Sequence, residues 1–142
     1  MTPSVEFRRI PGATALAALV ATVGNGLVWS VGAAVDRMTI GVGEVVLASL
    51  VGAVAGGLTF ALCGRFAGKP VKVFTGLCIA VVVIYAGGPF LAAWEPYMEG
   101  AKRFNAATIV ATQGMHLVSA GSVWYFLTRR AVSSPGSLAD SS

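Results

Sequence analysis

The chain has 142 residues, of which 56% are hydrophobic and only 11% charged, whereas soluble domains are roughly one-quarter charged. This composition excludes an ordinary soluble domain and favours a membrane protein. The formal net charge of +4 comes from short basic clusters between apolar segments, which favours lipid headgroups over nucleic acid as the counter-charge.

The first predicted elements are a short N-terminal segment, residues 1–12, and a membrane helix over residues 13–35, since about 20 apolar residues cross a bilayer. Arg8 and Arg9 before an apolar run are also typical of a signal peptide. However, the run is longer than a usual signal core, and SVGAAV before a cleavage near Ala34 is a poor site, so we predict a retained helix. Small and polar residues follow one face of this helix: Thr14, Ala18, Ala21, Asn25 and Gly32.

The second predicted membrane helix covers residues 43–63 and carries a stripe of small residues. Ala48, Gly52 and Gly56 lie on one face, with Thr59 and Cys63 continuing it. Because the hydrophobic effect does not press helices together in lipid, small residues that let backbones approach supply the attraction. We interpret the stripe as a packing surface within the bundle, and self-association as the alternative.

The third predicted helix, residues 71–94, contains Pro89. Proline removes one backbone amide and crowds the carbonyl of Tyr85, so we predict a helix kink. Broken helices also line substrate sites in transporters, but Pro89 is near the outer end of the helix, which favours a structural kink.

The fourth predicted helix, residues 104–127, holds His116, the only histidine. At about 100° per residue, a polar arc forms one face: Asn105, Thr108, Thr112, Gln113, His116 and Ser119. Lipid would leave these groups unpaired, so the arc should face the bundle. Depth matching makes Asn25 of the first helix a hydrogen-bond partner for His116. The candidate functional residues are therefore His116, Gln113, Thr112, Ser119, Asn105 and Asn25.

The sequence offers few groups for catalysis or metal binding. Every acidic residue lies at or beyond a helix end, which argues against a proton relay and leaves His116 without a carboxylate to orient it beside Ser119. A single histidine supplies one haem ligand at most, and Cys63 and Cys78 form neither a CxxC pair nor a zinc site. We expect no enzyme activity, no cofactor and no metal. A structural role for His116 is favoured, with a functional one as the alternative.

Orientation follows from the basic residues, which are retained on the cytoplasmic side. Seven lie on one side of the predicted membrane: Arg8, Arg9, Arg65, Lys69, Lys72, Arg129 and Arg130. Three lie opposite, together with four acidic residues: Arg37, Lys102 and Arg103 with Asp36, Glu44, Glu95 and Glu99. Both termini are therefore predicted to be cytoplasmic, with residues 131–142 as a disordered tail.

Short motifs along nearly the whole chain carry a resemblance. Asp36 follows the first helix, Gly87, Gly88 and Pro89 end the third, and the fourth contains MHLV, residues 115–118. In these features the chain resembles a family of uncharacterised four-helix bacterial membrane proteins, domain of unknown function 6069. The resemblance implies a bacterial plasma-membrane protein and no established activity.

Together these features predict an all-α membrane protein with four transmembrane helices packed as one small antiparallel bundle. Its biochemical activity is not indicated. The leading hypothesis is a non-enzymatic membrane component, an accessory or partner-binding bundle that contacts a second copy or another membrane protein. The alternative is a small oligomeric transporter or pore that uses the polar face of the fourth helix.

Overall fold

The computed structural model describes residues 4–94 and 103–133, with the side chains of residues 92–94 left out. Within these ranges the chain forms four long α-helices: α1 (Ile10–Val35), α2 (Val42–Phe66), α3 (Pro70–Trp94) and α4 (Ala106–Arg130). One turn of 3-10 helix, η1 (Phe7–Arg9), precedes α1. The described residues contain no strand beyond a single bridge between Val5 and Val132. This confirms the predicted all-α class, and each helix lies within a few residues of its predicted segment.

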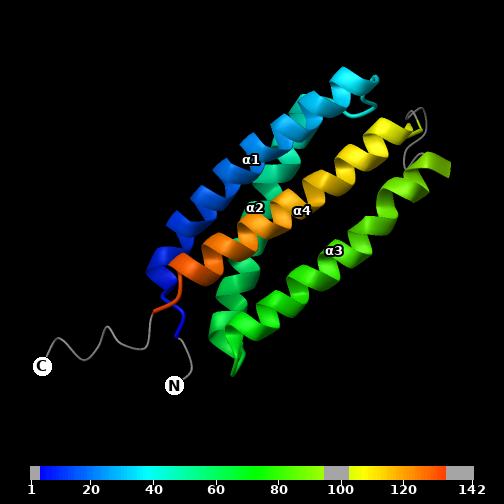
Figure 1. Cartoon of the computed structure of the whole chain (residues 1–142). Helices are drawn as coiled ribbons and strands as arrows, with labels where there is room; N and C mark the ends of the chain where they lie inside the picture. The colour runs from blue at the N-terminus through cyan, green and yellow to red at the C-terminus, as the bar shows by residue number, and fades with distance from the viewer. Residues whose placement is uncertain (1–3, 95–102, 134–142) are drawn as a thin grey trace, which may run out of the picture.

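The helices run alternately up and down along one long axis (Figure 1). Most contacts between helices join α1 to α4 and to α2, while α3 is attached more loosely to α4 and α2. Both ends of the described chain lie at the same end of the bundle as the connection between α2 and α3 (Figure 1). The arrangement is therefore an antiparallel bundle in which α3 is the least tightly held helix.

Three of the helices are long and apolar enough to cross a membrane: Phe7–Val35, Val42–Phe66 and Pro70–Leu91. The fourth is not, which corrects the expectation of four apolar spans. α4 is as long as α2, but its polar arc lowers its hydropathy. These polar side chains are partly covered because α4 contacts all three other helices.

Small residues account for the close contact between α1 and α4. Ala17 and Ala21 of α1 are fully buried. A Cβ added at Gly24 would lie 2.7 Å from Cγ1 of Val118 on α4, so only glycine fits at that point without a shift. In a membrane the hydrophobic effect does not bring helices together, so they associate where small residues let their backbones pack closely.

The packing face of α2 differs from the predicted one. The buried residues are Val45, Ser49, Ala53, Gly57, Phe60 and Cys63. Of the predicted packing residues, Gly56 does meet Val123 of α4, but Ala48 and Gly52 are exposed, and a Cβ at Gly52 would have no atom within 4 Å. The closest approach to α1 occurs at Gly57, next in sequence to Gly56, where a Cβ would collide with Thr14. Two members of the predicted stripe, Gly56 and Cys63, thus lie at the packing face. Ala48 and Gly52 do not, because the face that α1 and α4 contact is rotated by about one residue from the stripe.

The two ends of the described chain are joined to each other. The Glu6 amide donates to the Ala131 carbonyl at 2.9 Å, and the Ser133 amide donates to the Ser4 carbonyl at 3.1 Å. Ala131 is fully buried, so the order of the chain extends a few residues beyond the predicted start of the tail. Residues 134–142 of the predicted tail lie outside the described residues.

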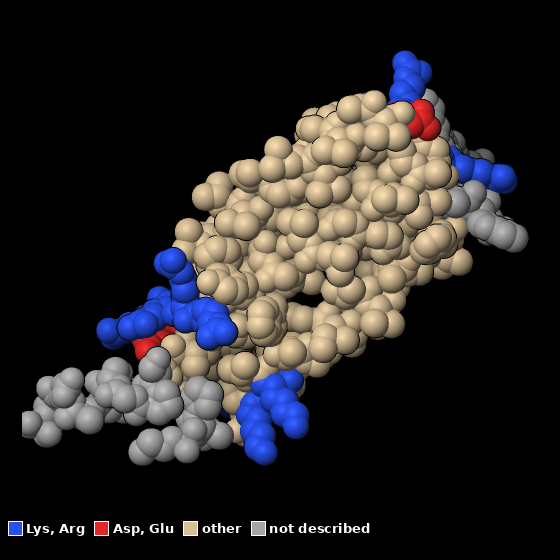
Figure 2. All heavy atoms as spheres, viewed as in Figure 1, with Lys and Arg blue, Asp and Glu red and all other residues tan. Residues whose placement is uncertain are grey.

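Charged residues lie at the two ends of the bundle. Figure 2 shows Lys and Arg at both ends of the long axis and an uncharged band between them. The end that holds the termini carries the seven basic residues expected together: Arg8, Arg9, Arg65, Lys69, Lys72, Arg129 and Arg130. The other end carries Asp36, Arg37, Glu44 and Arg103, while Glu95, Glu99 and Lys102 lie outside the described residues.

Candidate functional site

A cavity of about 660 Å³ lies between α2 and α3. Residues 44–59 of α2 form one wall and residues 74–85 of α3 the other, while α4 and Asn25 of α1 form the floor. A second hollow of about 420 Å³ lies between α3 and α4 and shares Cys78, Val82 and Ala120 with the first. Figure 2 shows an opening in the apolar band. The middle of α3 is therefore flanked by hollows on the sides that face α2 and α4.

The hollow arises from the small-residue stripe of α2. Ala48, Gly52 and Ala55 line the cavity wall and have too little side chain to fill it. α3 is attached toward its two ends instead. Near its start, Phe74 contacts Phe60 edge-to-face, with ring centroids 4.9 Å apart. Ala48 and Gly52, which were predicted to pack against another helix, thus leave space instead, together with the neighbouring Ala55.

Asn25 is the most buried polar residue of the floor, with 3% of its surface exposed. Its Nδ2 donates to Ser49 Oγ at 2.9 Å and to Ser119 Oγ at 2.7 Å. Ser49 gives its only proton to the Val45 carbonyl at 2.7 Å, so it can only accept from Asn25, and this fixes the amide orientation. Asn25 Oδ1 is buried and has no partner among the described residues.

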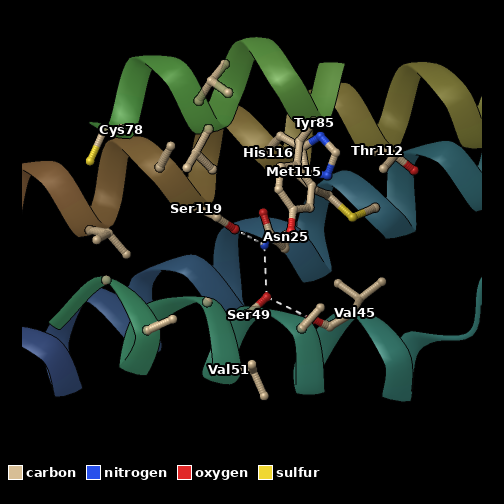
Figure 3. A pocket seen from close by; sticks show the side chains of 18 of the residues that line it. Asn25, Val45, Ser49, Val51, Cys78, Tyr85, Thr112, Met115, His116 and Ser119 are labelled. Atoms are coloured by element: carbon tan, nitrogen blue, oxygen red, sulfur yellow. Dashed lines mark hydrogen bonds between the residues drawn. The ribbon is translucent and has the colours of Figure 1, made fainter. Parts of the chain in front are cut away.

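His116 lies close to Asn25 across the floor (Figure 3). Its Nδ1 is buried and has no hydrogen-bond partner among the described residues, and its ring meets Tyr85 edge-to-face at 5.6 Å between centroids. The expected hydrogen bond between Asn25 and His116 is therefore not formed. Depth matching placed the two residues at one cavity, but both amide protons of Asn25 go to serines.

The other members of the polar arc bind backbone or loop groups. Asn105 caps α4 by accepting from the Thr108 amide at 2.9 Å, and its amide donates to the Arg37 carbonyl at 2.7 Å. Thr112 donates to the Thr108 carbonyl of its own helix at 2.7 Å. Thr108 also accepts from the amide of Thr39 at 2.9 Å. The arc thus divides into an outer part with structural contacts and an inner part, Thr112, His116 and Ser119, that lines the cavity.

Gln113 forms a hydrogen bond to the backbone of α3 near Pro89. Pro89 lies inside α3, which continues to Trp94. Gln113 Nε2 donates to the Ala86 carbonyl at 2.6 Å, three residues before the proline. Pro89 removes the amide that would bind the Tyr85 carbonyl, and Gln113 binds the next carbonyl along the chain, that of Ala86, beside the predicted kink.

Two cavity residues were missed from the sequence. Ser49 lies one position away from the predicted stripe of α2, and only its hydrogen bond to Asn25 identifies it as part of the site. Tyr85 was noted for its carbonyl alone, whereas its ring stands beside His116 (Figure 3). Among the described residues, no group of three or more His, Cys, Asp or Glu is placed to hold a metal ion.

Comparison with known protein families shows which family the chain belongs to. The model of the Family of unknown function (DUF6069) matches residues 5–133. The chain belongs to this family. No curated protein and no solved structure matches the chain significantly. Membership in DUF6069 thus indicates no activity, and a function has to be inferred from the site itself.

Proposed function

We propose that this DUF6069 protein is a non-enzymatic, four-span plasma-membrane protein that binds a small apolar or amphipathic molecule in the cavity between α2 and α3. The observation that carries the proposal is the cavity of about 660 Å³ with the unpartnered, buried Asn25 Oδ1 at its floor. Ligand sites are commonly cavities of roughly 300–1,000 Å³, mostly apolar, with a few convergent polar groups.

The proposed topology puts both termini in the cytoplasm. The seven basic residues at the end of the bundle that holds the termini support this orientation, because Lys and Arg are retained on the cytoplasmic side. α4 crosses as the fourth span in this proposal, with its polar arc directed to the other helices.

The alternative, a transporter or pore along the polar face of α4, has less support. A path through a single chain toward the cytoplasmic end would have to pass the buried rings of Phe60 and Phe74. The outer part of the arc is engaged in capping and loop contacts, through Asn105 and Thr108. Binding in the cavity, by contrast, needs no continuous path through the bundle.

The test compares molecules retained by the purified protein and two glycine variants. Gly52→Leu places a side chain in the cavity, since Gly52 lines it and a Cβ there meets no atom within 4 Å. Gly76→Leu is the matched control, because Gly76 of α3 is equally open but lines neither hollow.

Native mass spectrometry after mild detergent extraction measures the outcome. We expect a non-protein mass bound to the wild type and to Gly76→Leu, and occupancy reduced on the order of 10-fold in Gly52→Leu, since overfilling a site costs roughly 1–3 kcal/mol. Absence of any bound mass in all three, or equal occupancy in Gly52→Leu, would contradict the binding function.

A further inference from the structure

We propose that the ligand is an uncharged amphiphile with a hydrocarbon body and a hydroxyl head that donates a hydrogen bond to Asn25 Oδ1. This inference rests on the proposed binding function and specifies its ligand class. It follows from three properties of the cavity: its charge, its hydrogen-bonding state and its opening toward lipid.

The charge of the lining excludes ionised heads. Among the described residues that line the cavity, Glu44 is the only charged one, and none is Lys or Arg. The Glu44 carboxylate belongs to the first turn of α2, where it accepts from the Gly41 amide at 3.2 Å. A carboxylate or phosphate head would have no counter-charge in this lining, so its burial is strongly unfavourable. An ammonium head could pair only with Glu44 in the first turn of α2, more than one helical turn before Ser49, the α2 partner of Asn25.

Two buried atoms of the floor have no partner among the described residues, His116 Nδ1 and Asn25 Oδ1, and the second of these calls for a donor. The hydroxyl groups of Ser49, Thr59 and Thr112 donate to carbonyls of their own helices, at 2.7, 2.8 and 2.7 Å. The Asn25 amide nitrogen is bound to two serines. The remaining buried oxygen, Asn25 Oδ1, can only accept. A hydroxyl satisfies it, whereas an ether or ester, which only accepts, does not.

The walls suit a hydrocarbon body that arrives from the bilayer. Val51, Leu77 and Val81 line the cavity and are 60%, 43% and 50% exposed. A molecule dissolved in lipid can therefore enter between α2 and α3. Tyr85, 58% exposed, stands beside Asn25 and His116 (Figure 3), and in our proposal its ring turns outward as the head reaches Oδ1.

The experiment uses three photoreactive probes of one chain length in vesicles that contain the full-length protein. These are a diazirine-bearing hexadecanol, its methyl ether, which accepts but cannot donate, and the corresponding hexadecanoate. Labelled peptides are mapped by mass spectrometry, and the concentration for half-maximal labelling is measured for each probe. Unlabelled hexadecanol serves as competitor.

We expect the alcohol to label cavity-lining residues of α2 and α3 at a concentration about 10-fold below that of the ether, because a site built to accept a hydrogen bond discriminates against a ligand without the donor. The carboxylate should label least. Gly52→Leu should abolish the labelling by alcohol and ether alike, and Gly76→Leu should leave it unchanged.

Equal labelling by the alcohol and the ether would overturn the hydroxyl assignment while leaving the binding function in place, as would preferred labelling by the carboxylate. No competed labelling of the cavity by any probe would overturn both. The comparison of alcohol with ether is made on the wild type, so it does not depend on a variant that folds.

Discussion

At the scale of single residues, Asn25 connects more of the bundle than any other side chain of the cavity. It lies on α1 and binds Ser49 of α2 and Ser119 of α4, so one amide joins three helices. Its remaining oxygen, Oδ1, is buried at the floor of the cavity and has no partner among the described residues. The same residue therefore sets the rotation of the helices and presents the acceptor on which our ligand proposal depends.

We predict that Asn25→Leu destabilises the protein by roughly 1–2 kcal/mol, because hydrogen bonds between membrane helices average about 0.6 kcal/mol each and two are lost. Reversible unfolding in mixed micelles measures the change. Ser30→Ala is the control, since the exposed Ser30 hydroxyl donates only to the Gly26 carbonyl of its own helix, and its removal should have little effect. Equal effects of the two substitutions would show that the Asn25 bonds do not hold the helices together.

At the scale of helices, α2 carries glycines in two different environments, one at a helix contact and one at the cavity. Gly57 faces Thr14 of α1 at a distance that leaves no room for a methyl group, whereas Gly52 faces the open cavity. Thr14 is β-branched, so its side chain cannot simply swing away from an added Cβ. The contact between α1 and α2 thus depends on Gly57, and the cavity depends on Gly52.

From this difference we expect Gly57→Ala to destabilise the bundle by roughly 1–3 kcal/mol through overpacking. Gly52→Ala should be neutral or slightly stabilising, by up to about 1 kcal/mol, because alanine favours a helix more than glycine does. Both variants are measured by the same unfolding assay. A larger loss for Gly52→Ala than for Gly57→Ala would place the packing face of α2 on the stripe that the sequence had indicated.

These elements also show what the sequence could and could not predict. Helix positions and the polar arc followed from length and from the 100° spacing, which are local properties. The face of α2 did not, because only the positions of the neighbouring helices decide that Gly57 meets α1 and Gly56 meets α4, while Gly52 meets neither. Matching depths in the membrane were enough to predict that Asn25 and His116 lie close together, and both lie at one cavity. The hydrogen-bond partners of Asn25 could not be predicted, because they depend on helix rotation. Its partner Ser49 lies one residue outside the predicted stripe of α2.

At the scale of the whole molecule, the central question is how many helices cross the membrane. Three are apolar enough by composition, yet α4 lies antiparallel among them (Figure 1). At 1.5 Å per residue its 25 residues reach about 37 Å, more than the roughly 30 Å of hydrocarbon. The bridge between Val5 and Val132 supports our proposal that the two ends of the described chain lie on one side of the membrane. A chain with only three crossings would place them on opposite sides.

The most direct test labels single cysteines from one side of the membrane. In a Cys63→Ala, Cys78→Ala background, Gly41→Cys, Gly68→Cys and Ser133→Cys report on the first connection, the second connection and the end of α4, without altering a charge. Intact bacterial spheroplasts are treated with an impermeant maleimide before and after lysis. Our account predicts that Gly41→Cys reacts in intact cells, while Gly68→Cys and Ser133→Cys react only after lysis. Reaction of Ser133→Cys in intact cells, with Gly68→Cys still protected, would contradict it.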